Sequence, residues 1–393
     1  MHLVSLKIAA LAIALPLMCS WTDTAQSETP FDSIDRFTQK AVDDGKVAGG
    51  CLLVYHGGKV VHQVAFGYAD RESHRPFEID TPVVIASISK PILSTLLHHL
   101  VDQDKLDLDA PIAEYLPEFS SCRLESGALL DRSPTTTELI THTSGIRPDE
   151  AADGRVWYQS WTADQSLEYV VKRIADDFPF KHQPGEKFAY SGIGTEVAAR
   201  VGEVVTERTR NEMLQEYFCA PLGLTATYYR DRSALESLDV QPATRYYRGA
   251  KSGKLFRSNE RPVPEANRYS SSGGSIISSA PDLLTWLLMI RNGGRHDGGT
   301  YLSKESHTHF VTEHEIGYAA KGGMFIRRRD DFGNPARYSH TGSSGTNVWI
   351  DFEQDTIGIM LTQTRGSDIR EFRKELERRV TESVAMLDAV PID

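Results

Sequence analysis

The sequence predicts an α/β (α+β) fold in which helices flank one antiparallel sheet that is built from both ends of the chain. Two observations lead to this prediction. Segments with the apolar or alternating pattern of strands cluster near both ends of the 393 residues, and the stretch between them is dominated by helical patterns and Pro/Gly loops. We therefore expect a mainly helical subdomain inserted between the two halves of the sheet.

The first half of the sheet is predicted to follow a short helix. Asp32 is a suitable capping residue for a helix whose apolar positions recur at helical spacing. Residues 51–55 and 60–66 have the composition of strands, and the Gly57-Gly58 pair between them is typical of a hairpin turn. A helix therefore leads into a β-hairpin.

The second half of the sheet is predicted near the C-terminus. Residues 346–352 and 356–363 have the pattern of strands, and residues 281–291 that of a strong helix. Residues 369–384 carry apolar side chains at helical spacing, which predicts an amphipathic terminal helix. The charged run at 327–331 is interpreted as a solvated loop.

Residues 87–101 are predicted to form a buried helix, in which Pro91 is tolerated because it falls in the first turn. Ser87 would then lie where unpaired backbone N–H groups and the positive end of the helix dipole converge. Lys90 follows three residues later and so shares a helix face with Ser87. A hydroxyl beside an amine is a nucleophile beside a base, provided that burial or neighbouring cations keep the amine partly neutral.

Two further motifs follow Ser87 along the chain. Tyr190-Ser191-Gly192 comes after a Pro-Gly turn, and His340-Thr341-Gly342-Ser343 precedes the predicted strand at 346–352. Taken singly, each motif has an ordinary structural explanation, a packed aromatic ring in one case and a histidine that enters a strand in the other. Their order after Ser-x-x-Lys changes this interpretation.

The ordered set resembles the serine β-lactamase and penicillin-binding protein superfamily, and within it the class C-like branch of class C β-lactamases, DD-carboxypeptidases and family VIII-type esterases. Residues 106–117, 139–145 and 273–278 also look like that branch, and the resemblance covers about residues 32–385. It implies a β-lactamase/transpeptidase-like fold and a serine hydrolase that forms an acyl-enzyme, with no cofactor and no metal.

The resemblance also implies a role for each matching residue. Ser87 would be the acylated nucleophile, Lys90 would take or relay its proton, and Tyr190 would be the partner base and later protonate the leaving group. His340 would occupy the slot usually held by lysine, where it faces the substrate carboxylate or supports the proton network. The implied oxyanion-hole and substrate-binding positions are the backbone N–H groups of Ser87 and Ser343, together with Thr341, Gly342 and Gly192.

Two departures from the family pattern bear on the substrate. Gly192 stands where β-lactamases and DD-peptidases usually have asparagine, so the side-chain amide that would bind the substrate's acylamino group is missing. His340 replaces lysine and carries less charge near pH 7. Both changes favour ester or amide substrates without a strictly required acylamino group and carboxylate, so an esterase-like or DD-peptidase-like activity is preferred over a β-lactamase.

Composition limits the partners. Lys and Arg number 43 against 54 Asp and Glu, a formal net charge of −11, which argues against nucleic acid as a partner. We expect a small-molecule or short-peptide substrate, and the oligomeric state stays open. The alternative function is a non-catalytic or stoichiometrically acylated cell-wall or ligand sensor, which would use the same cleft without turnover.

The N-terminus is expected to be an export signal. Residues 8–18 form an apolar segment that is too short to span a bilayer, and a polar stretch follows. We predict a signal peptide over residues 1–25, a periplasmic or secreted protein, and no transmembrane segment after the signal. Lipidation at Cys19 is an alternative way of anchoring the exported chain.

One hydrolase domain is expected after the signal. It spans residues 26–393, with a sheet part at about 26–82 and 268–393 and a helical part at about 83–267. Cys51, Cys122 and Cys219 remain after signal removal and are interpreted as small buried residues. A single disulfide among these three stays open in an oxidising compartment.

Overall fold

The computed structural model describes most of the chain. The described residues are 29–147, 165–231, 235, 240–258, 270–366 and 369–389. The expected signal peptide at residues 1–25, with Cys19, lies outside them and stays a prediction. Within the described part of the chain, no helix has both the length and the apolar character that crossing a bilayer requires.

Seven antiparallel strands form the central sheet, and both ends of the chain supply them. In sheet order they are β11 (Phe325–Arg329), β12 (Pro335–Thr341), β13 (Asn347–Asp351), β14 (Thr356–Thr362), β1 (Gly49–His56), β2 (Lys59–Asp70) and β3 (Arg75–Pro76). The two ends meet where β1 pairs with β14, with Leu52 opposite Met360. The predicted fold class is thereby confirmed.

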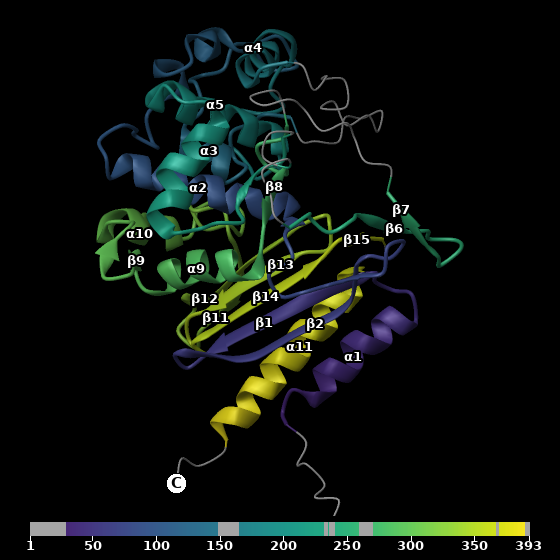
Figure 1. Ribbon diagram of the computed structural model, residues 1–393. Coiled ribbons are helices and arrows are strands. Elements are labelled where there is room, and N and C mark those ends of the chain that lie inside the picture. The colour runs from purple at the N-terminus through teal and green to yellow at the C-terminus, as the bar shows by residue number, and fades with distance from the viewer. Residues whose placement is uncertain are drawn as a thin grey trace, which may run out of the picture.

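Helices α1 (Asp32–Asp43) and α11 (Ile369–Asp388) cover one face of the sheet (Figure 1). Side chains alternate between the faces of a strand, so Leu52 and Val54 of β1 pack with these two helices. The same core holds Phe31, Ile34, Phe66, Trp349, Met360, Phe372, Leu376 and Val380. Backbone pairing and apolar packing together hold the two ends of the chain against each other.

The opposite face of the sheet packs against the helical region. Cys51, Leu53 and Tyr55, the other residues of β1, belong to a large core that includes α2 (Ser89–Val101) and α9 (Ala280–Arg291). Burial on both faces explains why β1 reads as an unbroken apolar run. Helix α2 is thus anchored in the centre of the molecule.

The middle of the chain is mainly helical, and it also contains short strands. The other helices with described bounds there are α3 (Thr136–Ile140), α4 (Leu167–Asp177), α5 (Gly192–Thr206), α6 (Arg210–Leu214), α7 (Ala220–Leu222) and α10 (Lys304–Val311). Shorter helical turns lie at Ala86–Ile88, Ile112–Glu114, Pro117–Ser121 and Gln215–Cys219. The division into a sheet part and a helical part at residues 82 and 268 stays a prediction.

Three small sheets lie outside the central sheet in the described part of the chain. Two of them have three strands, in the orders β4-β8-β5 and β15-β6-β7, and one is the hairpin β9-β10. The strands are β4 (Val83–Val84), β5 (Tyr228–Tyr229), β6 (Tyr246–Arg248), β7 (Leu255–Arg257), β8 (Ile276–Ser278), β9 (Arg295–His296), β10 (Gly299–Thr300) and β15 (Thr364–Arg365).

Three local predictions are corrected by the structure. Ser87 lies in the 3₁₀ turn Ala86–Ile88, so the α-helix begins at Ser89 rather than at Ser87. The run Arg327–Arg329 belongs to β11 and is not a loop, because a strand at the edge of a sheet tolerates alternate charged side chains. His340 lies inside β12, a strand of its own, instead of just before the strand at 347.

The three cysteines of the described chain are free, buried thiols, so the disulfide that the sequence left open does not form among them. Burial raises the pKa of Cys51 to about 12 and that of Cys122 to about 11. Cys219 is shifted in the same direction. Thiols of this kind are poor nucleophiles, which leaves Ser87 as the nucleophile to consider.

Candidate active site

Ser87 lies in a strained turn just before α2. The residue before it, Ala86, has a φ of 51°, a left-handed conformation that costs a residue other than glycine about 1–3 kcal/mol. Strand β4 leads into the turn and pairs with β8, and the Ile85 N–H donates to the Ile276 carbonyl oxygen at 2.9 Å. Surrounding pairings therefore hold a conformation that the local chain alone would avoid.

The Lys90 amine lies beside the Ser87 hydroxyl. Its Nζ is 3.3 Å from Ser87 Oγ and donates to the Gly273 carbonyl oxygen at 2.9 Å. The residue is only 9% exposed, and within the described residues no carboxylate forms an ion pair with it. A carbonyl oxygen accepts this hydrogen bond without placing a negative charge beside the amine.

Gly273 reaches Lys90 because it has no side chain. A Cβ at this position would lie 3.0 Å from Lys90 Nζ, and 3.2 Å from both Lys90 Cε and Thr195 Cβ. These distances are shorter than ordinary van der Waals contact. The glycine thus allows its own carbonyl group to approach the amine.

The turn that follows β12 packs against the turn that carries Ser87. Ser344 Oγ donates to the Val84 carbonyl oxygen at 2.6 Å, and Thr346 Oγ1 donates to the Ile85 carbonyl oxygen at 2.9 Å. Both hydroxyls are buried. Two short side-chain bonds therefore tie the end of β12 to the residues that lead into the nucleophile turn.

Gly342 begins this second turn at a place where no side chain fits. A Cβ would lie 2.1 Å from Thr346 Oγ1 and 2.3 Å from the Ile85 carbonyl oxygen. The following residue, Ser343, is exposed, and the residues on either side of it contact the segment that leads into the Ser87 turn. An oxyanion hole requires two backbone N–H groups close together, and the pairing of the Ser87 and Ser343 N–H groups stays a prediction.

Arg373 of α11 braces the same turn. Its Nη1 donates to the carbonyl oxygens of Gly342, at 3.0 Å, and of Thr346, at 3.2 Å. Burial and the neighbouring charge of Arg370 lower the pKa of Arg373, but a guanidinium starts so high that it stays protonated at neutral pH. A helix on the far face of the sheet thus contributes a fixed positive charge to the turn.

The Tyr190 ring lies close to Lys90, with 5.1 Å between Nζ and the ring centroid. Helix α5 begins directly after it, because Ser191 Oγ caps the helix by accepting the Gly194 N–H at 3.2 Å. Gly192 is the first residue of this helix and presents no side chain to the site. This cap fixes where α5 begins, and so fixes the position of Tyr190 just before the helix.

His142 supports Tyr190, a contact that the sequence did not reveal. The two ring centroids are 4.3 Å apart, and His142 Nδ1 accepts the Ser191 N–H at 3.2 Å. An N–H group can only donate, so Nδ1 carries no hydrogen. Burial and the nearby charge of Lys90 lower the pKa of His142 to about 3, so the ring is neutral at pH 7.

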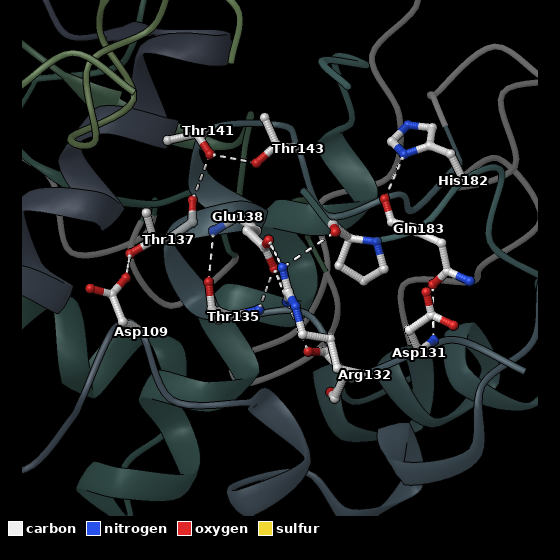
Figure 2. Close-up of polar contacts among 12 residues, drawn as sticks. Asp109, Asp131, Arg132, Thr135, Thr137, Glu138, Thr141, Thr143, His182 and Gln183 are labelled. Atoms are coloured by element: carbon white, nitrogen blue, oxygen red, sulfur yellow. Dashed lines mark hydrogen bonds and ion pairs between the residues drawn. The ribbon is translucent and has the colours of Figure 1, made fainter. Parts of the chain in front are cut away.

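Polar contacts around α3 hold the segment that presents His142 (Figure 2). Thr135 and Glu138 form a reciprocal capping box at the start of this helix, and Arg132 pairs with the Glu138 carboxylate. At the other end, Thr141 Oγ1 donates back into the helix at 2.8 Å. His142 follows with a φ of 62°, a left-handed turn that ends the helix.

His340 is buried at the end of β12, with 1% of its surface exposed, and stacks on Phe325 at 5.0 Å between centroids. Its Nδ1 donates to the Thr341 carbonyl oxygen at 3.1 Å, and Nε2 has no hydrogen-bond partner within the described residues. Burial, and then the charge of Lys90, lower the pKa of His340 well below its ordinary value. The ring is therefore neutral at pH 7, which fits support of a proton network and does not fit attraction of a carboxylate.

Phe325 links these side chains into a row of aromatic rings. Its centroid lies 6.3 Å from that of Tyr190, 6.5 Å from that of His142 and 5.0 Å from that of His340. On its other side it contacts Tyr318 at 5.2 Å, and Tyr318 is 48% exposed. A row of aromatic rings therefore runs from Tyr190 through the buried Phe325 to the exposed Tyr318.

The predicted site residues fall into two groups that the fold brings together. Those near the lysine are Ser87, Lys90, Tyr190 and Gly192, and those at the end of β12 are His340, Thr341, Gly342 and Ser343. Sequence reasoning did not assign a site role to Gly273, His142, Phe325 or Arg373. For His142 and Gly273, the available signal was the family resemblance of residues 139–145 and 273–278. Within the described residues, no three His, Cys, Asp or Glu side chains converge so as to hold a metal ion.

Comparisons with known proteins agree with this geometry. The family model described as Beta-lactamase matches residues 34–382. Esterase EstB of Burkholderia gladioli is 29% identical over 282 residues, which are 66% of this chain and 69% of that protein. A provisionally named D-alanyl-D-alanine carboxypeptidase of Escherichia coli K12 is 24% identical over 378 residues, which are 87% of this chain and 84% of that protein.

Solved structures show the same fold. EstCE1, described as a hydrolase with promiscuous acyltransferase activity, has a TM-score of 0.76 at 21% identity, and the match covers 90% of this chain and 98% of that one. Simvastatin synthase LovD of Aspergillus terreus has a TM-score of 0.74 at 18% identity, covering 91% of this chain and 98% of that one. At these identities the likeness supports the fold alone.

Replacing Arg373 should loosen the turn at Gly342. We expect Arg373→Ala to slow covalent reaction of Ser87 with a fluorophosphonate by about tenfold, less than the ~10²-fold or more that follows loss of a whole oxyanion donor. Arg379→Ala is the matched control, since Arg379 lies on the same helix and bonds instead to the Ser33 carbonyl oxygen at 3.2 Å. Equal labelling rates in the two variants would contradict the bracing role.

Three buried neutral histidines should make the protein less stable in acid. Burial lowers the pKa of His98 to about 4, and His142 and His340 are lowered as well. Below the unfolded value of about 6.5 the unfolded chain takes up protons that the folded chain does not, so stability falls with pH by about 1.4 kcal/mol per unit for each histidine. Urea unfolding between pH 7.5 and 5 should therefore show about 2 kcal/mol less loss in His98→Gln than in the wild type. Identical losses would show that His98 is not buried in its neutral form.

Proposed function

The chain belongs to the β-lactamase family, and on this premise we propose that it is a serine hydrolase that cleaves ester or amide bonds through an acyl-enzyme on Ser87. Its relatives include an esterase and a provisionally named carboxypeptidase, both of which point to hydrolysis of an acyl bond. One observation carries the proposal. Lys90 Nζ lies 3.3 Å from Ser87 Oγ, and a backbone carbonyl group holds it there.

Acylation follows from this arrangement. In its neutral amine form, Lys90 accepts the Ser87 hydroxyl proton while Oγ forms a bond to the substrate carbonyl carbon, and the carbonyl oxygen becomes an oxyanion. The N–H groups of Ser87 and Ser343 bind that oxyanion, and a donor of this kind is worth about 3–4 kcal/mol in the transition state. The carbonyl then re-forms and the bond to the leaving group breaks. Tyr190 gives its phenolic proton to the leaving atom, and Lys90 passes the serine proton on to Tyr190.

Deacylation uses the same groups in reverse order. A water molecule enters the position of the leaving group, and Tyr190, after Lys90 has drawn off its proton, takes a proton from that water as it attacks the acyl carbon. The second tetrahedral intermediate collapses, the bond to Ser87 Oγ breaks, and Lys90 returns a proton to the serine oxygen. No charge or atom is left over, so one site completes both halves of the reaction.

Neutral esters are the substrates that this site fits best. Gly192 has no amide to bind an acylamino group, and the neutral His340 ring cannot attract a carboxylate as a lysine would. Nε2 of His340 carries a lone pair and is buried without a hydrogen-bond partner among the described residues, so it is suited to accept a hydrogen bond from an enclosed water molecule. Efficient β-lactam turnover, which relies on both missing interactions, is therefore not expected.

The leaving group should be apolar or aromatic. It departs on the side of Tyr190, which protonates it, and the row of rings from Tyr190 through Phe325 to Tyr318 lies on that side. The Phe188 ring lies 4.9 Å from the Tyr318 ring between centroids and extends this row. Flat aromatic surfaces favour contact with apolar groups and other rings.

We also propose that the protein is exported. The support is the apolar segment at residues 8–18, followed by a polar stretch, as in a signal peptide ahead of a periplasmic or secreted protein. Its partner there would be a small-molecule or short-peptide substrate. Mass determination of the mature protein from its native host would test this, with loss of about 25 residues expected and an intact N-terminus contradicting it.

Covalent labelling tests the proposed nucleophile. A fluorophosphonate should attach one phosphonyl group to the wild type, found at Ser87 by mass spectrometry, and none to Ser87→Ala. Lys90→Ala and Tyr190→Phe should each lower turnover of p-nitrophenyl acetate by about 10²-fold or more, as loss of a general base does. Label that persists on Ser87→Ala would exclude Ser87 as the nucleophile. Labelling of the wild type without turnover would favour the alternative of a stoichiometrically acylated sensor.

Exchange of His340 tests the substrate class. The wild type should hydrolyse p-nitrophenyl acetate and the corresponding phenyl ester far better than nitrocefin, which carries a carboxylate. His340→Lys should raise the ratio of kcat/KM for nitrocefin over p-nitrophenyl acetate about tenfold, because a positive charge then faces the carboxylate. A ratio that stays constant would mean that residue 340 does not set the preference for neutral substrates.

A further inference from the structure

Glu196 is a buried carboxylate that the mechanism above does not use. It is 2% exposed on α5, in a stretch from Ile193 to Ala199 that is buried throughout. Burial raises the pKa of Glu196. Placing a carboxylate among apolar side chains costs stability unless its oxygens are well bonded, so the contacts that it makes are informative.

Those contacts all go to one short segment. The Ser272 N–H donates to both carboxylate oxygens, at 3.0 and 2.9 Å, and Ser271 Oγ donates to one of them at 2.9 Å. The next residue is Gly273, whose carbonyl oxygen accepts the Lys90 amine at 2.9 Å. Only one peptide unit therefore separates the atom that Glu196 holds from the atom that holds Lys90.

Neighbouring groups complete the anchor. Arg210 donates to the Ser270 carbonyl oxygen and lies over the Tyr229 ring at 4.5 Å. The Tyr229 hydroxyl donates to the Ser272 carbonyl oxygen at 3.3 Å. Side chains from α5, α6 and β5 thus converge on residues 270–272 from the N-terminal side of Gly273.

The C-terminal side of Gly273 is held by the nucleophile segment itself. Ser89 Oγ, between Ser87 and Lys90, accepts the Ile276 N–H at 3.2 Å, and β8 pairs with β4. The segment between these two anchors is short and turns on itself, with the Ser275 N–H donating to the Ser271 carbonyl oxygen at 2.9 Å. The position of the Gly273 carbonyl oxygen is consequently set by Glu196 on one side and by Ser89 on the other.

From these contacts we infer that Glu196 is a positioning residue, which sets the Lys90 amine against Ser87 through residues 271–273. The inference rests on the proposed serine hydrolase and extends it. Tyr190 lies just before α5 and Glu196 lies in its second turn, so this helix positions both of the groups that move protons. Lys90 and Tyr190 therefore keep their separation when the rest of the chain fluctuates.

Variants at position 196 test the inference. Glu196→Ala should lower kcat for p-nitrophenyl acetate and the fluorophosphonate labelling rate by about 10- to 100-fold, with KM changed less than about threefold, because Glu196 does not touch the substrate. Glu196→Gln keeps one carbonyl oxygen for the Ser272 N–H and should recover activity to within about fivefold of the wild type.

Glu203→Ala is the matched control. Glu203 lies on the same helix and accepts the backbone N–H of Arg210 at 2.8 Å, and no hydrogen bond or ion pair is seen between it and residues 271–273. We expect a comparable drop in melting temperature for both alanine variants and a change of less than about twofold in kcat for Glu203→Ala. Equal kcat losses in the two variants would overturn the inference and leave Glu196 a purely structural residue.

A double-mutant cycle with Lys90→Ala gives the decisive readout. If Glu196 acts through the lysine, Glu196→Ala should slow labelling of the Lys90→Ala enzyme by less than about threefold further. Losses that multiply in the double variant would overturn the inference. Failure of the wild type to be labelled at Ser87 is a separate outcome, which would overturn the proposed function and this inference together.

Discussion

The proposed catalytic arrangement depends on two places where the backbone of a glycine approaches its neighbours closely. At Gly342 a turn presses against the Ile85 carbonyl oxygen, and at Gly273 a carbonyl group reaches the Lys90 amine. Both contacts involve backbone atoms, whose positions follow from the whole fold rather than from flexible side chains.

The fold supplies those atoms from distant parts of the sequence. Pairing of β1 with β14 closes the sheet between the two ends of the chain, and this places the end of β12 beside the nucleophile turn. Helix α11 packs beneath the sheet and also sends Arg373 to the turn at Gly342. Burial also determines the charges of the site, because it keeps the rings of His142 and His340 neutral. The Lys90 amine is held by the Gly273 carbonyl oxygen.

Much of this architecture could be predicted from the sequence because it rests on local patterns. The unbroken apolar run of β1 reflects burial of that strand, and the helical spacing of apolar residues in α11 reflects burial of one face of the helix. The three motifs, in their order along the chain, indicated the family. β11 was missed because arginines on an edge strand have the pattern of a solvated loop. The positions of Gly273, His142, Arg373 and Glu196 could not be read from periodicity, since each contacts residues far away in the chain.

A crystal structure of the enzyme trapped with a phosphonate on Ser87 tests the central claim most directly. The account predicts that the phosphoryl oxygen lies about 2.7–3.1 Å from the N–H nitrogens of both Ser87 and Ser343. It also predicts that Lys90 Nζ keeps its bond to the Gly273 carbonyl oxygen, as in the free enzyme. A phosphoryl oxygen directed into solvent, or a lysine turned away from the serine to a different acceptor, would contradict it.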